Sequence, residues 1–126
     1  KGARGVDART HPWGEETSGK HANYIDSGDP FDNSTTPVGF FPAGAAPSGA
    51  LDMAGNVWEW VADWFDERYY ASSPTSNPRG PSSGEGRVLR GGSWINLPLS
   101  LRTSHRGARD PTDCTNFIGF RCARDE

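Results

Sequence analysis

The 126 residues are enough for one small domain built around one core. Hydrophobic residues make up only 33% of the chain, and the 16 Gly and 10 Pro predict a loop-rich fold in which five Trp offset the shortage of aliphatic side chains. The net charge of −3, with both signs interspersed, argues against a general nucleic-acid binder, which needs a basic face.

No apolar run approaches the roughly 20 residues that a membrane span needs, and no signal peptide is visible. The chain starts with Lys1 and not Met, so we expect a fragment or a processed product. The two cysteines, Cys114 and Cys122, form neither a disulfide framework nor a metal-binding spacing, and they leave the compartment undecided.

Residues 1–50 read as turns and short extended pieces. The sequence predicts one helix, beginning near Asn56 in GNVWEWVADWFDERYY, because Asn56 can cap it and Glu59 completes a capping-box pattern. Val57, Val61 and Trp64 would lie on one face of that helix. Residues 71–86 form a loop on composition alone.

RVLRGGSW, residues 87–94, reads as a strand ended by Gly91 and Gly92. FIGFRCA, residues 117–123, is the last predicted strand, with Ile118, Phe120 and Cys122 on one side by period two. The segment 95–117 between them has neither helical nor strand period, and loops of that length are usually functional or disordered. Leu101 and Arg102 are its expected anchor.

Several motifs stand together in chain order: HPWG, HANY, TTPVGFFP, LDMAGNVWEWVADWF, NPRGP, RVLRGGSW and IGFRCAR. With these motifs the chain resembles the formylglycine-generating-enzyme (sulfatase-modifying factor) superfamily over essentially its whole length. The resemblance implies an α+β, C-type-lectin-like fold, rich in loops with few short strands and helices. It matches the C-terminal half of a typical member, so either the fold is minimal or part of the molecule has been lost.

The family's oxidase binds copper through two cysteines after the GGS strand, since soft thiolates suit Cu(I). By the resemblance those positions fall on Asn96 and Leu101, so we expect no copper and a non-catalytic member. Related enzymes of the superfamily need clustered histidines. His11, His21 and His105 show no ligand spacing and are expected at the surface or in turns.

Between the positions of segment 95–117 that match the family frame lie fifteen others, and none of them is Lys, Gln, Glu, Met or Trp. They are Ile95, Asn96, Leu97, Leu99, Ser100, His105, Gly107, Ala108, Arg109, Asp110, Asp113, Cys114, Thr115, Asn116 and Phe117. Diversity-generating retroelements randomise adenines in Asn codons, and the products cannot encode those five residue types. The chain thus resembles a variable protein of such an element, which would have a prokaryotic or viral origin. Display on a cell surface or virion is one expectation, and the compartment stays open.

These fifteen positions would form a ligand-binding face, held between fixed strands, for a protein or other macromolecular ligand. Ile95, Leu97, Leu99 and Phe117 would be its apolar anchors, and His105, Arg109, Asp110 and Asp113 its polar contacts. The alternative is that Leu97 and Leu99 are ordinary core residues. Arg102, Arg106 and Arg121 are expected to hold the frame through hydrogen bonds to carbonyls and carboxylates.

The resemblance also implies a structural Ca²⁺ bound by the side chains of Asp52 and Glu59 and the carbonyls of Gly55 and Val57. The alternative is that Glu59 only closes the capping box and Asp52 only caps a turn. A second site would involve Asn23, the Tyr24 carbonyl and a carboxylate from one of three aspartates: Asp26, Asp29 or Asp32.

In relatives with a disulfide, the cysteine of GFRC pairs with a position near Ala3. The resemblance therefore leaves Cys122 as a small buried thiol and Cys114 as an exposed residue of the variable segment; a bridge between the two is possible by sequence but not expected. The sequence as a whole favours a binding or display protein. An oxidase or related metal-dependent enzyme of sulfur chemistry is the competing class, and a structural accessory domain of a longer protein is the third.

Overall fold

The computed structural model describes residues 3–31 and 33–123. Its strands are β1 (Trp58–Trp64), β2 (Arg87–Arg90), β3 (Gly107–Arg109) and β4 (Ile118–Gly119). Three 3-10 turns, η1 (Pro42–Gly44), η2 (Tyr69–Ala71) and η3 (Pro98–Leu101), supply its helical structure. None of the helices in the described part has the length or apolar character that a membrane crossing needs.

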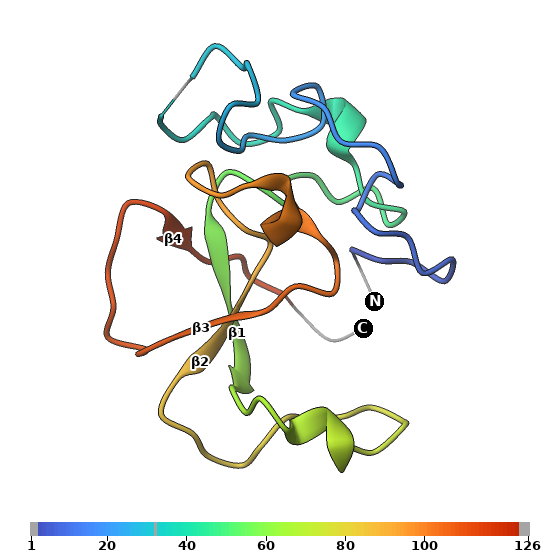
Figure 1. Ribbon diagram of the computed structural model, residues 1–126, viewed down its shortest axis with the longest axis vertical. Coiled ribbons are helices and arrows are strands. Elements are labelled where there is room, and N and C mark those ends of the chain that lie inside the picture. Colours follow the sequence, from blue (N-terminus) through green and yellow to red (C-terminus); the bar gives the residue numbers. More distant parts are fainter. Residues whose placement is uncertain (1–2, 32, 124–126) are drawn as a thin grey trace.

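The four strands form one small sheet in the order β3-β2-β1-β4. β2 runs antiparallel to β1 and β3, and β4 runs parallel to β1. Figure 1 shows the segments before β1 arranged as loops above one end of the sheet, while η2 and the following loop lie at its other end. The expected turns in 1–50 and the loop 71–86 are confirmed, apart from η1 and the last residue of η2.

The helix predicted from Asn56 is wrong, because this stretch forms β1. Asn56 has φ +65°, which is not the extended backbone of an N-cap residue. Its side-chain amide accepts from the Thr36 N–H and donates to the Thr36 carbonyl, joining the start of β1 to the N-terminal loops. Trp58, Trp60 and Trp64 sit two or four residues apart, a spacing that also fits a strand with aromatic β propensity.

The glycine pair ends β2 as expected. Gly91 and Gly92 have φ of +92° and +73°, a backbone conformation that residues with a Cβ rarely adopt. A Cβ on Gly92 would lie 3.0 Å from the carbonyl oxygen of Ser100. The pair therefore lets the chain turn and the start of segment 95–117 pack closely on itself.

The predicted final strand is much shorter than 117–123, since β4 holds only Ile118 and Gly119. Phe120 is 77% exposed and Cys122 is exposed too, so the expected buried thiol is wrong. Cys114 is exposed as expected, and both thiols are free. Burial by period two fails here because β4 pairs with β1 for only two residues.

The core is small and is centred on Leu101. Leu101 is fully buried with Ala22 and Ala54, and Trp13 and Tyr24 pack against this cluster. The expected anchor role of Leu101 is confirmed. A fully buried leucine in the middle of 95–117 ties this long segment to the N-terminal loops.

His11 lies in the turn 11–14, where its backbone bonds that of Gly14 at both N–H groups, so the expected turn position is confirmed; the alternative of a surface position is wrong, because His11 is only 7% exposed. The His11 ring is stacked with that of Trp13, with 5.4 Å between ring centroids, and Trp13 is also stacked with His21, at 5.2 Å. Large flat rings bury area efficiently in a chain with few aliphatic residues. The histidine serves here as a packing residue.

Candidate functional site

A cavity of about 210 Å³ lies over the sheet where segment 95–117 crosses it. Trp58 of β1 and Leu89 of β2 line it from the sheet. Six of the fifteen predicted ligand-binding residues line the rest: Ile95, Asn96, Gly107, Ala108, Arg109 and Phe117. We call this the loop cavity. Trp58 and Leu89 were missed by sequence reasoning, because only the pairing of strands places them beneath the segment.

Strand pairing fixes both sides of the loop cavity. Leu89 pairs with Gly107 across β2 and β3. The Trp58 N–H donates to the Phe117 carbonyl at 2.8 Å, which fixes the far end of the segment. The Trp94 N–H donates to the Asn56 carbonyl at 3.0 Å, which fixes its near end. The backbone frame is therefore held by the sheet at both ends.

The two positions that the resemblance assigns to copper cysteines have structural roles here. The Asn96 side-chain oxygen accepts from the Ser93 N–H at 3.0 Å and from its hydroxyl at 2.8 Å. Ser93 and Leu101 are both fully buried. Neither the amide of Asn96 nor the side chain of Leu101 offers a thiolate.

Leu97 and Leu99 are 65% and 61% exposed, so the alternative that they are core residues is wrong. Ile95 is 37% exposed beside them in sequence. The Ile25 N–H donates to the Asn96 carbonyl at 3.1 Å, which places another half-exposed aliphatic residue against the segment. Leu97 and Leu99 thus add exposed apolar area to the segment beyond the loop cavity, whose lining already includes Ile95.

The stretch 110–117 is organised by local polar contacts. The Asp110 carboxylate accepts from the Thr112 hydroxyl and N–H, and these bonds lower the pKa of Asp110. Asp113 forms a 3.7 Å ion pair with Arg109. Both aspartates thus stabilise the loop, and their exposure leaves remaining acceptor capacity facing solvent.

His105 lies against Trp58, with ring centroids 5.7 Å apart. Burial lowers the pKa of His105, and the positive charges of Arg102 and Arg90 lower it further. The neutral imidazole is therefore favoured at neutral pH, and His105 is available as a hydrogen-bonding group without a charge.

The three predicted frame arginines behave differently. Arg121 donates to the carboxylate of Glu59 and to two backbone carbonyls, and Arg102 donates through Nε to the Leu99 carbonyl at 3.0 Å, as expected. Arg106 departs from the expectation, because its guanidinium carbon lies 4.3 Å from the Tyr70 ring centroid and 5.2 Å from that of Phe65. It contacts aromatic faces in place of oxygen acceptors.

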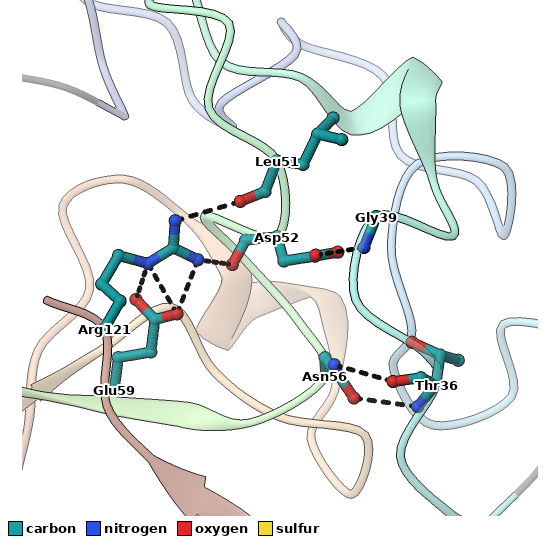
Figure 2. A network of polar contacts seen from close by, with 7 residues as sticks. All are labelled: Thr36, Gly39, Leu51, Asp52, Asn56, Glu59 and Arg121. Carbon is teal, nitrogen blue, oxygen red and sulfur yellow. Dashed lines mark hydrogen bonds and ion pairs between the residues drawn. The ribbon is translucent and has the colours of Figure 1, made fainter.

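All four predicted calcium ligands, Asp52, Gly55, Val57 and Glu59, line a second cavity, of about 480 Å³. Figure 2 shows the hydrogen bonds and ion pair that the polar residues of this cavity make. Arg121 contacts both oxygens of Glu59 at 2.7–2.8 Å and donates to the carbonyls of Leu51 and Asp52. The Asp52 carboxylate accepts from the Gly39 N–H at 2.7 Å. The capping-box alternative is wrong, because a strand and not a helix follows. The bond from the Gly39 N–H to Asp52 caps the turn 37–40, as the other alternative to calcium expects.

The oxygen set fits a hard cation. A carboxylate has about four lone-pair sites, so the contacts that Glu59 and Asp52 already make leave acceptor capacity on both. No backbone amide of the described residues donates to the Gly55 or Val57 carbonyl. Asp52 has φ +55° and Gly55 +81°, so the turn between them has a backbone that most residues disfavour. In residues 3–31 and 33–123 no three acidic, His or Cys side chains are grouped for a metal, so carbonyls must complete any site.

The second predicted metal group is occupied by internal hydrogen bonds. Asn23 is 2% exposed and donates to the Ser34 carbonyl. Both carboxylate oxygens of Asp29 accept, from the Ser27 hydroxyl and the Phe31 N–H. Asp26 is exposed, and Asp32 lies outside the described residues.

Comparison with known proteins places this geometry in a family. The Sulfatase-modifying factor enzyme 1-like domain family matches residues 1–126, so the chain belongs to that family. The structure of PvdO from Pseudomonas aeruginosa superposes with a TM-score of 0.79 at 34% identity, over 94% of this chain and 46% of that one. The fold is therefore the α+β, C-type-lectin-like fold that the resemblance implied, with 3-10 turns as its helical part.

Treponema denticola variable protein 1 superposes with a TM-score of 0.70 at 29% identity, over 94% of this chain and 41% of that one. Among curated relatives, serine/threonine-protein kinase pkn1 of Chlamydia caviae is 42% identical, over 95% of this chain and 18% of its own length. Formylglycine-generating enzyme of Streptomyces coelicolor is 38% identical, over 96% of this chain and 42% of its own length. The chain thus spans less than half the length of these relatives.

Proposed function

We propose that this chain is a non-catalytic, ligand-binding member of its family, and that segment 95–117 is its binding face. The observation that carries the proposal is the grouping of six predicted ligand-binding residues around the loop cavity over Trp58. Leu97 and Leu99 extend the face with exposed apolar surface. A macromolecular partner suits a face that joins a small cavity to flanking aliphatic side chains.

The division of labour within the segment supports this proposal. Leu101, Asn96 and the pairing of β3 with β2 hold the backbone, while the side chains of Leu97 and Leu99 are exposed. A face whose backbone is already ordered loses little conformational entropy on binding. Substitution of the outward side chains would then change specificity without unfolding the domain.

We further propose that a retroelement diversifies this face. The five residue types missing from the fifteen positions support it, and so does the likeness to a variable protein of known structure. Sequencing the gene and its neighbourhood is the test. An Asn-rich near-repeat of the coding segment for 93–121, differing at adenines and next to a reverse transcriptase, is expected; its absence overturns this part.

Paired libraries test the binding face itself. One library randomises five exposed positions of the segment, Leu97, Leu99, Ala108, Cys114 and Asn116; the other randomises five exposed positions of the loop after η2, Ser72, Thr75, Ser76, Ser82 and Ser83. Both are selected by display against the same set of folded proteins. We expect folded binders mainly from the first library. Equal yields from the two libraries contradict a dedicated face.

We propose Ca²⁺ as a structural ion held by Asp52, Glu59 and the carbonyls of Gly55 and Val57. An ion there would tie the turn before β1 to the strand and balance the charge of Asp52, since Glu59 already forms an ion pair with Arg121. It would lie in the cavity of about 480 Å³ that these residues line, which shares no lining residue with the loop cavity. Its role would therefore be to support the fold.

The competing function is an oxidase, and the relationship to formylglycine-generating enzymes favours testing it. The measurement is conversion of cysteine to formylglycine in a sulfatase-type peptide, followed by mass spectrometry with and without copper. We expect no conversion, because positions 96 and 101 carry no thiolate. Copper-dependent turnover by this chain would overturn the non-catalytic assignment.

A further inference from the structure

A third cavity lies at the end of the sheet where η2 packs, and no part of the proposed function uses it. It measures about 210 Å³ and is lined by residues of β1, β2 and η2, by Arg106, and by Pro78, Gly80 and Pro81. It shares no lining residue with the loop cavity. Its size is below the ~300–1,000 Å³ of pockets that hold drug-sized ligands, so it suits a small molecule.

Arg106 is the unusual group in its wall. The guanidinium lies over the rings of Tyr70 and Phe65, with its carbon 4.3 Å and 5.2 Å from the two ring centroids. Within the described residues it has neither an ion-pair partner nor an acceptor for its N–H groups. Aromatic contact satisfies only the faces of a guanidinium, so its five edge donors remain available to an oxyanion.

The charge of the cavity also favours an anion. Arg90 lines the cavity, and its terminal nitrogens donate to the carbonyls of Thr103 and His105. Asp63 is the one carboxylate in the lining. Two guanidinium groups therefore face one carboxylate, and a singly charged anion would balance the remaining positive charge.

The remaining wall is apolar and aromatic. Trp64, Tyr69 and Tyr70 line it with Val61 and Val88. The Tyr69 hydroxyl accepts from the Gly80 N–H at 3.1 Å, and its O–H proton remains available as a donor. Arg106 supplies the charged donors, and the aromatic and aliphatic part of the wall fits a flat or branched apolar body.

We propose that this cavity binds a small organic carboxylate with an aromatic body, with the carboxylate on the edge of the Arg106 guanidinium. The planar fork of arginine matches two carboxylate oxygens. Stacking on Tyr70 pre-orients that fork, so little side-chain freedom is lost on binding. Arg106 belongs to segment 95–117, but it is not one of the fifteen predicted ligand-binding residues and does not line the loop cavity, so the two sites use different side chains.

The probe is benzoate, titrated into the whole chain at low ionic strength by calorimetry. Benzamide has the same shape without charge, and acetate has the charge without the ring. We expect benzoate to bind at least tenfold more tightly than either. Saturable binding that is no tighter than that of acetate marks an adventitious anion only and overturns the proposal.

Arg106→Gln should weaken benzoate binding at least tenfold. Arg87→Gln is the matched control, because Arg87 also lies on an aromatic ring, at 3.6 Å from Trp64, but does not line the cavity. It should change binding less than twofold. Equal losses in the two variants overturn the assignment to Arg106.

Two further measurements keep the test decisive if Arg106→Gln is unstable. Arg106→Lys keeps a positive charge over the aromatic rings but lacks the planar pair of donors that binds two carboxylate oxygens. This variant should fold and bind benzoate about threefold to tenfold more weakly. In NMR spectra of the unaltered chain, benzoate should shift the amide resonance of Gly80. The amide resonance of Ala108, which lines the loop cavity, should not shift. Shifts at Ala108 alone overturn the location. Leu97→Ser should leave benzoate binding unchanged, which separates this site from the proposed binding face.

Discussion

Arg121 and Glu59 form a bidentate ion pair although 62 residues separate them in the chain, with nitrogen–oxygen distances of 2.7–2.8 Å. The same guanidinium donates to the carbonyls of Leu51 and Asp52. One side chain thus joins the C-terminal segment after β4 to both the start of β1 and the turn before it. The pair holds these segments together, and both residues line the predicted calcium cavity.

Arg121→Gln should therefore lower the free energy of unfolding by roughly 1–2 kcal/mol. Hydrogen bonds to charged groups contribute ~1.5–3 kcal/mol, and the value is discounted because the Arg121 side chain is 37% exposed. Urea titration followed by tryptophan fluorescence measures it. Arg79→Gln, on an exposed loop, is the control with the same charge change. A loss no larger than that of the control would show that the pair is not stabilising.

Calcium should raise the midpoint of thermal unfolding, and a chelator should reverse the rise. At a free calcium concentration one hundred times the dissociation constant, binding to the folded state raises the free energy of unfolding by about 2.7 kcal/mol. Asp52→Asn and Glu59→Gln should each reduce this increment strongly, and Glu67→Gln, on an exposed turn, should leave it unchanged. Differential scanning calorimetry with and without calcium distinguishes these results. If calcium raises the midpoint of the Asp52→Asn variant as much as that of the unaltered chain, the proposed ligand set is wrong.

Substitutions at neighbouring positions of the binding face should differ in how much they lower the free energy of unfolding. Asn96→Ala removes the acceptor of two hydrogen bonds from the fully buried Ser93 and should cost about 1–3 kcal/mol. Leu97→Ser and Leu99→Ser change exposed side chains and should stay within about 0.5 kcal/mol. Denaturant midpoints of the three variants provide the comparison. If Asn96→Ala is neutral, position 96 varies as freely as its neighbours.

Acidification should weaken the fold through His105. Burial first, and then Arg102 and Arg90, lower the pKa of this imidazole below its usual value near 6.5. The unfolded chain then takes up the proton at a higher pH than the folded chain does. Stability from this group is therefore complete above about pH 6.5 and falls as the pH drops toward the folded pKa.

The measurement is the urea midpoint at pH 7.5 and pH 5.5, for the unaltered chain and for His105→Gln. The variant should lose less stability between these two pH values. The carboxylates with lowered pKa values, those of Asp7, Glu15 and Asp110, act in a more acidic range and do not enter this window. An identical fall in both proteins would assign the pH dependence to other groups.

Leu101→Ala should cost about 2–5 kcal/mol, the usual range for a fully buried leucine truncated to alanine. Leu51→Ala, at a half-buried position on the rim of the calcium cavity, should cost less. Thermal unfolding by circular dichroism gives both values. A small effect at Leu101 would mean that segment 95–117 is not anchored through the core.

The regular part of the molecule was readable from local sequence where one signal dominated. Paired glycines permit positive φ, so the end of β2 followed directly from Gly91 and Gly92. Leu101 was the expected anchor of segment 95–117, and it is fully buried, whereas the equally apolar Leu97 and Leu99 are exposed. The family motifs indicated the C-type-lectin-like fold over the whole chain, and the family match confirms it.

Stretches that satisfied two periods were decided by tertiary contacts. Val57, Val61 and Trp64 fit a helical spacing, yet Trp58–Trp64 form a strand, because β2 and β4 pair with its two edges. The side chain of Asn56 bonds the backbone of Thr36, which no local pattern predicts. Backbone hydrogen bonds to distant segments outweigh propensities of a few tenths of a kcal/mol per residue.

By itself the sequence determined the family, the loop-rich character, the absence of thiols at positions 96 and 101, and which segment is exceptional. Only the tertiary structure decided which residues of that segment hold the backbone and which are exposed. Asn96 bonds the buried Ser93 and Leu97 is exposed to solvent, and both outcomes depend on packing. It also placed Arg106 on two aromatic rings and Cys122 at the surface. Contacts between residues far apart in the chain arise from the folded arrangement, and local spacing carries little information about them.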